Sequence, residues 1–335
     1  MFDTVGVLIL VVLIALFGFL ATRAWKLKNA ILKWGGVVIA GLLTLLPTAL
    51  LVLALVGFYK LNERHDNPVA NLQVAGTPAQ IARGEQLAHI CVSCHTSDDQ
   101  LPLSGVDFLA KFSGPPLGTL YAPNLTPSGT IKDWTDGEVI RAIREGVHKN
   151  GRSLLIMPAE NFRNLSDDDV QALVAYLRLQ PATGGPTPTN EFDLFGALFI
   201  NLFDFRTAQQ PVGRVTAPQP GTPDYGKYMV DIIGCRSCHG DQLQGKVDNG
   251  QPGPTPGPNL TKIVPQWTEE QFMTFFNTGQ LPGPDGRTVP ILTLPSGFSE
   301  PRMPWPMVRA ATTDDELRAM YAYLHSLPPV EGPAK

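Results

Sequence analysis

The sequence has few charged residues. Asp, Glu, Lys and Arg make up 17% of its 335 positions, whereas hydrophobic residues make up 44%. A disordered chain needs the opposite balance, so this chain is not disordered as a whole. The 26 basic residues do not outnumber the 30 acidic ones, and the formal net charge is -4. Because the chain lacks the positive charge that a polyanion requires, we expect no nucleic acid among its partners.

Cysteine is equally scarce, with four residues in the whole chain. They form two pairs with the same spacing, and a histidine follows each pair directly. A Cys-x-x-Cys-His run is the attachment signature of c-type haem, in which the thiols form thioethers and the histidine binds the iron. The sequence therefore predicts two covalently bound haems (haem c). The residues concerned are Cys91, Cys94 and His95, and Cys235, Cys238 and His239.

Three other uses of such a cysteine pair have to be weighed. A thioredoxin-like redox pair needs a βαβ context, and a zinc site needs further Cys or His ligands at short spacing; the sequence offers little of either. A disulfide is the remaining alternative. Because haem attachment would use all four thiols, we expect no structural disulfide.

Residues 1–60 contain two long apolar runs. Residues 4–22 include no charge, and 19 residues make about 28 Å of helix, enough to cross a hydrocarbon core. The second run, residues 37–59, contains Pro47, which a membrane-spanning helix tolerates. A cleaved signal peptide is the alternative for the first run, but no basic residue precedes it and no small-residue cleavage site follows it. We predict two transmembrane helices.

The short connection between the two runs is basic. It carries Arg23, Lys26, Lys28 and Lys33 and no acid, which places it on the cytoplasmic side. This predicts a multi-pass protein of the bacterial inner (cytoplasmic) membrane whose haem domains face the periplasm or outer side. The membrane is thus an expected partner.

The remainder of the chain contains an internal repeat. Each half passes through the same landmarks in the same order after its Cys-x-x-Cys-His run, and the interval from that histidine to Met-Pro is 62 residues in one half and 64 in the other. Two copies of one domain explain this order. The landmarks are Pro-Asn-Leu-Thr (123–126 and 258–261), Trp-Thr (134–135 and 267–268), Met-Pro (157–158 and 303–304) and Tyr-Leu (176–177 and 323–324).

The repeat sets the expected domain boundaries. After the membrane helices we expect a linker over 61–75, the first haem domain over 76–182, a second linker over 183–221, the second haem domain over 222–329 and a tail over 330–335. Helix starts recur within both domains, where a hydroxyl at the N-cap precedes an acid or amide three residues later. These pairs are Thr135 with Glu138, Thr268 with Gln271, Ser166 with Asp169, and Thr313 with Glu316.

A haem iron has a sixth coordination position, and methionine can fill it. In the first half, Met157 stands in a loop before the final helix and its proline restricts the backbone, whereas His148 is the competing ligand. In the second half Met303 occupies the equivalent place and Met307 is its rival; Met273 and Met320 lie on helical faces. We predict the iron ligands His95, Met157, His239 and Met303. The segment between Arg287 and Met303 lengthens the second ligand loop.

Each half resembles a class I cytochrome c domain. The resemblance rests on the attachment residues, on the Met-Pro ligands and on an expected crossing of the first and last helices. The crossing pairs Gly84 with Tyr176 in one half and Gly226 with Tyr323 in the other. The resemblance implies an all-α fold, here an N-terminal transmembrane helical hairpin followed by two tandem class I cytochrome c domains. Finer motifs are similar to cytochrome subunits of periplasmic alcohol and aldehyde dehydrogenases, which usually carry three haem domains and no hairpin. Those motifs are Ala122-Pro123-Asn124-Leu125-Thr126, Trp134, and Gly146 to Gly151.

The architecture also resembles the dihaem subunit of C-family haem-copper oxidases. Together with the predicted hairpin, the resemblances imply a membrane-anchored relay of single electrons on the periplasmic side. It would work as a subunit of a respiratory or other electron-transport complex, with redox donor and acceptor proteins; within this class, the alternative is a cytochrome subunit that accepts electrons from a periplasmic alcohol or aldehyde dehydrogenase. Such a relay is not an enzyme, and we expect no catalytic residues. A dihaem peroxidase, in which one iron would be open, is the alternative; two Met-Pro ligands and the lack of an acid/base cluster favour the relay.

The second linker contains an apolar stripe. In residues 191–206 the helical spacing gathers large apolar side chains on one face and Asp193, Asn201 and Asp204 on the other. We expect the stripe to be buried between the two haem domains, with contact to the bilayer surface or to a partner subunit as the alternative. The stripe consists of Phe192, Phe195, Phe199, Leu202 and Phe203. The acidic runs at 98–99, 167–169 and 314–315 are expected to be solvated turns or helix starts.

Overall fold

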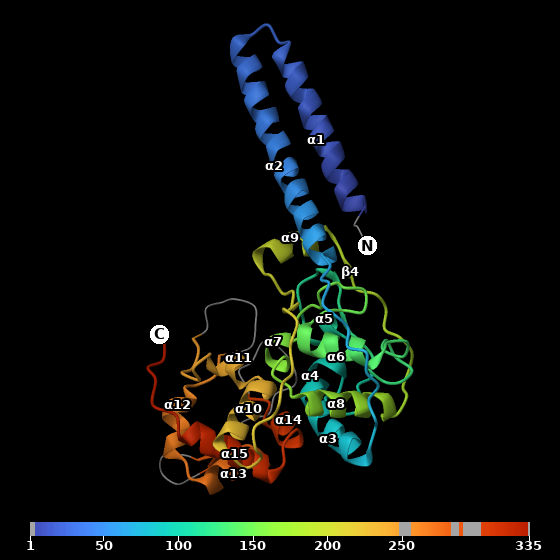
Figure 1. Ribbon diagram of the computed structural model, residues 1–335. Helices are drawn as coiled ribbons and strands as arrows, with labels where there is room; N and C mark the ends of the chain where they lie inside the picture. Colours follow the sequence, from blue (N-terminus) through green and yellow to red (C-terminus); the bar gives the residue numbers. More distant parts are fainter. Residues whose placement is uncertain (1–3, 248–255, 283–287, 291–302, 334–335) are drawn as a thin grey trace. The chain divides into compact units, whose positions relative to one another are not determined.

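The structure is a computed structural model that describes residues 4–247, 256–282, 288–290 and 303–333 (Figure 1). Within these ranges the chain is mostly helical, with three two-stranded antiparallel sheets. It divides into two compact units. The first contains the apolar N-terminal region with Gly114–Leu120 and Thr189–Arg206, and the second contains both Cys-x-x-Cys-His runs. Most of the lengthened loop predicted between Arg287 and Met303 lies outside the described residues.

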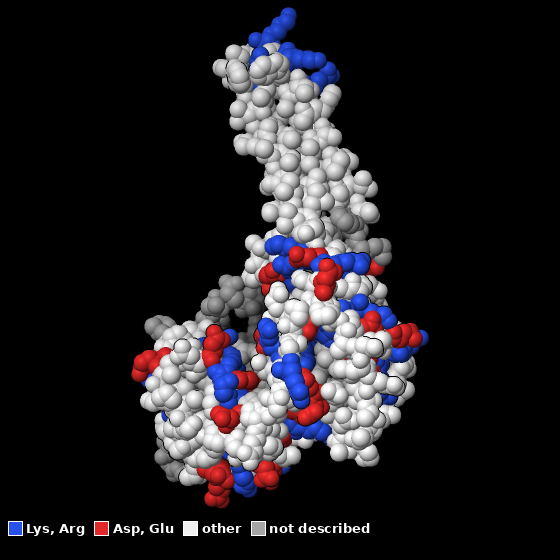
Figure 2. All heavy atoms as spheres, viewed as in Figure 1, with Lys and Arg blue, Asp and Glu red and all other residues white. Residues whose placement is uncertain are grey.

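The first unit is built on a helical hairpin. Helix α1 (Thr4–Trp25) and helix α2 (Ala30–Asn62) lie side by side, and both are long and apolar enough to cross a membrane by length and composition. At the connection, the Trp25 and Trp34 rings meet edge to face with centroids 5.5 Å apart. Figure 2 shows the sides of the hairpin free of charged groups and a cluster of Lys and Arg at the connection. The predicted hairpin therefore forms, and α2 continues through Pro47.

The same unit also contains the predicted apolar segment, but its packing differs from the prediction. Helix α9 (Leu194–Leu202) packs against α2, and the preceding strand β4 (Glu191–Phe192) pairs with β2 (Gly118–Thr119). The buried residues of α9 are Gly196, Ala197 and Ile200, whereas most of the predicted stripe is exposed or half-buried. The expectation that this stripe would be buried between the haem domains is therefore wrong. The small side chains allow the two helix backbones to approach closely, which large aromatic rings would prevent.

The second unit holds the two repeated domains, each with a first helix, an attachment turn, a middle helix, a short helix after Met-Pro and a last helix. The first domain comprises α3 (Pro78–Ala88), η1 (His89–Cys91), α4 (Val92–His95), β1 (Val106–Asp107), α5 (Phe108–Lys111), β3 (Tyr121–Ala122), α6 (Asp136–Glu145), α7 (Ala159–Phe162) and α8 (Asp167–Leu179). The second comprises α10 (Pro223–Ile233), α11 (Cys235–His239), α12 (Leu260–Ile263), η2 (Val264–Gln266), α13 (Glu269–Thr278), β5 (Gln280–Pro282), β6 (Thr288–Pro290), α14 (Trp305–Ala310) and α15 (Asp314–His325).

The predicted helix starts are confirmed. Thr135, Thr268 and Thr313 form complete capping boxes with the residues three positions later. Ser166 accepts a hydrogen bond from the Asp169 amide at the start of α8. Because each cap satisfies backbone donors that the helix leaves free, these short helices begin at defined residues.

First and last helices cross in each domain at a glycine. A Cβ on Gly84 would lie 1.9 Å from the carbonyl oxygen of Ala172, and one on Gly226 would lie 1.9 Å from that of Ala319. The predicted contact of Gly84 with Tyr176 is present, whereas Gly226 meets Ala319 and Met320 more closely than Tyr323. Ala172 and Ala319 occupy equivalent places in the repeat, so the two crossings have the same geometry.

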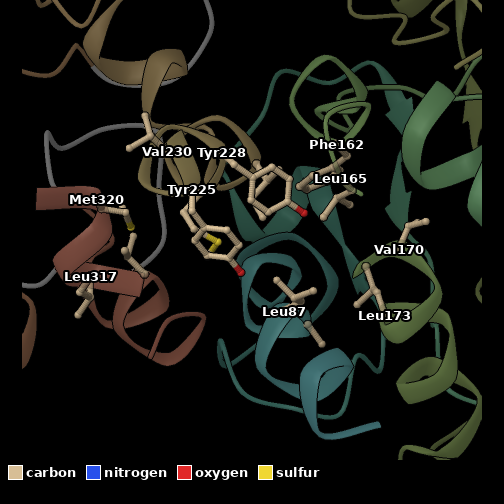
Figure 3. Close-up of a cluster of buried hydrophobic side chains, with 14 of the residues drawn as sticks. Leu87, Phe162, Leu165, Val170, Leu173, Tyr225, Tyr228, Val230, Leu317 and Met320 are labelled. Atoms are coloured by element: carbon tan, nitrogen blue, oxygen red, sulfur yellow. The ribbon is translucent and has the colours of Figure 1, made fainter. Parts of the chain in front are cut away.

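The two domains share one hydrophobic core. A single cluster of buried side chains runs from α3 and α8 of the first domain to α10 and α15 of the second. Figure 3 shows Tyr225 and Tyr228 of α10 between Leu87 and Phe162 on one side and Met320 on the other. A shared core holds the two domains in one arrangement, because separating them would expose these side chains to water.

Candidate haem-binding sites

The cysteines and histidine of each run lie on one helical turn. Cys91 ends η1, and Cys94 and His95 belong to α4; the second set lies within α11. Spacings of three and four residues place such side chains on the same helix face. Each cysteine carries a free thiol. Burial raises the pKa of Cys91 and of Cys235 to about 12, so both thiols are protonated at neutral pH, unlike the thiolates of thioredoxin-like pairs.

Both histidines are buried, and their rings are held in one orientation. His95 is 8% exposed and His239 is 5% exposed. Nδ1 of His95 donates to the carbonyl oxygen of Pro123 over 2.9 Å, and Nδ1 of His239 donates to that of Pro258 over 2.7 Å. Since Nδ1 carries the proton, the Nε2 lone pair is available. Burial also lowers the pKa of both rings and keeps them neutral, which is the form that binds a metal.

The carbonyl groups that orient the histidines are themselves held by a repeated loop. Asn124 and Asn259, the residues after the two prolines, each accept a hydrogen bond on Oδ1 from the threonine two positions later, over 2.7 Å in both domains. Their amide groups donate to backbone carbonyls beyond the last helix, Thr183 in one domain and Val330 in the other. The Pro-Asn-Leu-Thr loop therefore fixes the position of the carbonyl group that orients each histidine ring.

The two predicted methionine ligands have the same local backbone. Pro158 has φ -78° and ψ 61°, Pro304 has φ -77° and ψ 55°, and each is the centre of an inverse γ-turn. The turn is closed by a 2.8 Å hydrogen bond from Ala159 to the Met157 carbonyl, and from Trp305 to the Met303 carbonyl. Both methionines are partly buried against the shared core. This common turn supports their equivalence.

The competing ligands lie in other settings. Met307 lies inside helix α14, after the turn. His148 is half-buried beside Trp134, with ring centroids 4.7 Å apart, and its Nδ1 lies 2.9 Å from Oδ1 of Asn150. The choice of Met157 and Met303 over these residues stays a prediction.

The side chains present in each half fit a covalently attached haem. Two neutral thiols and one neutral imidazole lie on a single helical turn, and a thioether sulfur follows in a separate turn. Two buried donor atoms that are close to the methionines in the sequence lack an acceptor among the described residues: Nε of Arg152 and Nε1 of Trp305. Haem carries two carboxylates, which are acceptors of the kind that these donors lack.

A polar network between the two domains was not predicted from the sequence. Arg83 of α3 donates to Asp169 of its own domain over 2.8 Å and to Glu316 of the other over 2.6 Å. The Tyr225 hydroxyl accepts from Arg83 and donates to Glu316. The Tyr228 hydroxyl donates to Asp169. Asp169 and Glu316 are buried, although the acidic run that includes Asp169 was expected to be solvated. Their equivalent places in the repeat were the only sequence signal for this network.

The proposed haem-binding elements of the two domains also touch. Nδ2 of Asn161, which lies in α7 just after Met157, donates to Oγ of Ser237 between the second pair of cysteines over 3.2 Å. Helix α14, which follows Met303, packs beside η1, which contains Cys91. Each methionine turn is therefore connected to the attachment turn of the other domain.

Comparison with known proteins agrees with the repeat. The family described as cytochrome c matches residues 81–180 and again residues 225–328. The alcohol dehydrogenase (quinone) cytochrome c subunit of Gluconacetobacter polyoxogenes is 29% identical over 298 residues, which cover 78% of this chain and 60% of that protein. The fructose dehydrogenase cytochrome subunit of Gluconobacter japonicus is 25% identical over 223 residues, covering 60% and 45%.

A third relative belongs to another dehydrogenase. One of the subunits of nicotinate dehydrogenase from Pseudomonas putida is 30% identical over 221 residues, which cover 60% of this chain and 18% of that protein. The chain spans about 60% of the length of the first of these relatives.

Proposed function

Since this chain belongs to the cytochrome c family, we propose that it is a membrane-anchored dihaem electron carrier. The observation that carries the proposal is the duplicated site, in which a Cys-x-x-Cys-His turn is followed by a loop carbonyl that holds the histidine with Nε2 free. Two such sites in one chain predict two haems.

The residues that would hold each haem have separate roles. Cys91 with Cys94, and Cys235 with Cys238, would form the thioethers. Nε2 of His95 and of His239 would bind the irons, and the sulfur atoms of Met157 and Met303 would occupy the opposite positions. Haem held in this way supplies a one-electron iron couple without an open coordination position. Such a centre is suited to electron transfer and leaves little room for catalysis.

The contact between the domains supports transfer within the chain. The hydrogen bond from Asn161 to Ser237 and the packing of α14 beside η1 join the proposed ligand elements of both halves. The shared core and the Arg83 network hold the two domains in one fixed arrangement. We therefore infer that an electron crosses between the two centres through packed protein.

The hairpin supports membrane anchoring. Both helices have the length and composition of membrane spans, and α1 packs along α2 as part of one unit, which a cleaved signal peptide would not need to do. The four basic residues at the connection favour its cytoplasmic placement, so we infer that the haem domains face the periplasm.

The relatives suggest the partner. All three are named as cytochrome subunits or subunits of dehydrogenases. We infer that this chain accepts electrons from a dehydrogenase module on the periplasmic side and passes them to an acceptor at the membrane. The dihaem peroxidase alternative would require an open iron, which two methionine turns disfavour.

Purified full-length protein tests the carrier role. We expect two covalently bound haems per chain, a reversible one-electron change at each, and no appreciable carbon monoxide binding by the reduced protein, because methionine closes both irons. One haem per chain, or ready carbon monoxide binding at both centres, would contradict the proposal.

Partner identity is tested by isolation of the chain from membranes. A tag after Lys335 and extraction in mild detergent would recover the complex for identification of its subunits. A dehydrogenase catalytic subunit in stoichiometric amount is the expected result. Recovery of oxidase subunits instead would show that the chain serves a different electron-transfer complex.

A further inference from the structure

Helix α9 is held to α2 by small residues and backbone contacts. Ala197 and Ile200 are both 0% exposed. A Cβ on Gly57 of α2 would lie 1.7 Å from the carbonyl oxygen of Ala197, so the helix backbones touch at this glycine. Such close approach through small residues is typical of helices packed within membranes.

The contact lies inside the apolar run of α2. Nδ2 of Asn201 donates to the carbonyl oxygen of Leu53 over 2.9 Å. Leu53 stands six residues before Tyr59, the last residue of that run, which corresponds to about 9 Å of helix. Val7 of α1 packs against the same cluster, formed by Ala54, Phe58 and Ala197. If α2 spans the bilayer, the contacts of α9 therefore lie between about 3 Å, at Gly57, and about 9 Å, at Leu53, inside the end of the apolar run, a depth at which interfacial helices bury their apolar face.

The opposite face of α9 presents large apolar side chains. Phe195 is 51% exposed and Leu202 is 76% exposed, and the Phe195 and Phe199 rings are neighbours with centroids 6.3 Å apart. At the same level, α2 exposes Val52, Leu53 and Val56, so both helices present apolar side chains there.

The polar groups of the segment do not prevent immersion. Asp193 accepts a hydrogen bond from the Gly196 amide as the N-cap of α9. Beyond the other end of the helix, Asp204 is paired with Arg206, which also contacts Glu63 just after α2. Acidic side chains disfavour a helix that lies on a lipid surface, but Asp193 serves as a cap and Asp204 is in an ion pair, and both lie outside the helix itself.

We propose that α9 is a third membrane-embedded element of this chain, an interfacial helix whose Phe195–Leu202 face contacts lipid acyl chains. The proposal rests on the proposed anchoring of the hairpin. It commits to lipid because the depth of α9 is set by a helix whose own exposed surface at that level is apolar.

Single-cysteine variants of the full-length holoprotein in lipid nanodiscs test the proposal. The natural cysteines are expected to be consumed by haem, so Phe195→Cys and Leu202→Cys can each carry one nitroxide label. Collision with oxygen, which concentrates in hydrocarbon, is compared with collision with a water-soluble nickel chelate. Two labelled controls are Leu46→Cys in α2 and Leu179→Cys in α8, which replace leucines that are 63% and 60% exposed.

We expect the labels at 195 and 202 to favour oxygen as the label at 46 does, and the label at 179 to favour the nickel chelate. If 46 favours oxygen but 195 and 202 favour nickel, α9 is in water and the proposal is overturned. If neither agent reaches 195 and 202, a protein partner covers the face, which also overturns it. If 46 itself favours nickel, the membrane anchoring fails, and this proposal fails with it.

Discussion

Each proposed methionine ligand precedes a proline, and that proline shapes the backbone carrying the sulfur. The Met-Pro landmark was visible in the sequence, and the inverse γ-turn is its structural counterpart in both domains. The left-handed backbone of Ile156, with φ 64°, could not be predicted, because β-branched residues rarely adopt it. It results from the surrounding loop rather than from local preference.

Replacement of the ligands gives a spectroscopic prediction. Met157→Leu and Met303→Leu should each remove about half of the sulfur-to-iron charge-transfer band of the oxidised protein and lower one reduction potential, because methionine raises the potential of a haem. Met307→Leu, which removes a thioether from α14, should leave the band unchanged. Loss of the band in Met307→Leu with its retention in Met303→Leu would reverse the assignment in the second domain.

The strained residue before Met157 gives a stability prediction. Ile156→Gly should have a free energy of unfolding about 0.5–1 kcal/mol higher than Ile156→Ala, because both lose the isoleucine side chain and only glycine adopts a positive φ without strain. Chemical denaturation of both variants makes the comparison, and equal stability of the two would show that no strain is stored there.

At the scale of the elements, sequence patterns predicted helix starts correctly where a side chain hydrogen-bonds to the backbone a few residues away. The capping pairs gave the starts of four helices correctly. Helix α9 was predicted as a helix, but its buried face was wrong, because the prediction assumed that large apolar side chains seek a protein core. Small residues at a close helix contact, Ala197 against Gly57, leave no comparable signature in hydrophobic periodicity.

The helix crossings provide matched glycine substitutions. Gly84→Ala and Gly226→Ala should each lower the free energy of unfolding by about 3 kcal/mol, because the new Cβ would overlap a carbonyl oxygen of the last helix. Gly185→Ala, where nothing lies within 4 Å of the new Cβ, should change it by less than about 0.5 kcal/mol. If all three variants lost similar amounts of unfolding free energy, the cause would be glycine replacement in general and not the close contact at the helix crossings.

At the scale of the whole molecule, the sequence predicted two domains but not their common core. Repeat alignment shows which residues are equivalent, but not which face of one copy meets the other. Gln86 and Tyr228 are equivalent in the two first helices, and each donates to an acid at the start of the last helix of the other domain. Gln86 donates to Glu316, and Tyr228 donates to Asp169. This reciprocity depends on tertiary packing and emerges only from the structure.

The centre of that contact gives a prediction for Arg83. Arg83→Met should lower the free energy of unfolding by about 3–5 kcal/mol, because two buried carboxylates lose their common cation. Arg318→Met removes an ion pair with Glu269 in which both side chains are half exposed, and should change it by less than about 1 kcal/mol. Denaturant titration of the two variants measures the difference, and equal losses would show that the network is not a stabilising element.

The tyrosines of the same contact predict a pH dependence. Burial raises the pKa of Tyr225 and Tyr228 above the usual value of about 10, so the folded protein retains two protons that the unfolded chain releases. Stability is therefore complete below pH 10 and should fall as the pH rises beyond it, by about 1.4 kcal/mol per pH unit for each tyrosine. The double variant Tyr225→Phe with Tyr228→Phe should show a shallower fall between about pH 10 and 11. An unchanged slope would mean that neither phenol resists ionisation.

The common core also imposes an order on biosynthesis. On the proposed periplasmic placement, the first domain emerges before α10 and α15 do, so Leu87, Phe162 and Arg83 are exposed to water until the second domain follows. A polypeptide truncated after the first domain would leave this apolar surface exposed to water. We therefore expect such fragments to aggregate or be degraded. In the full chain, we expect the two domains to fold together in one step.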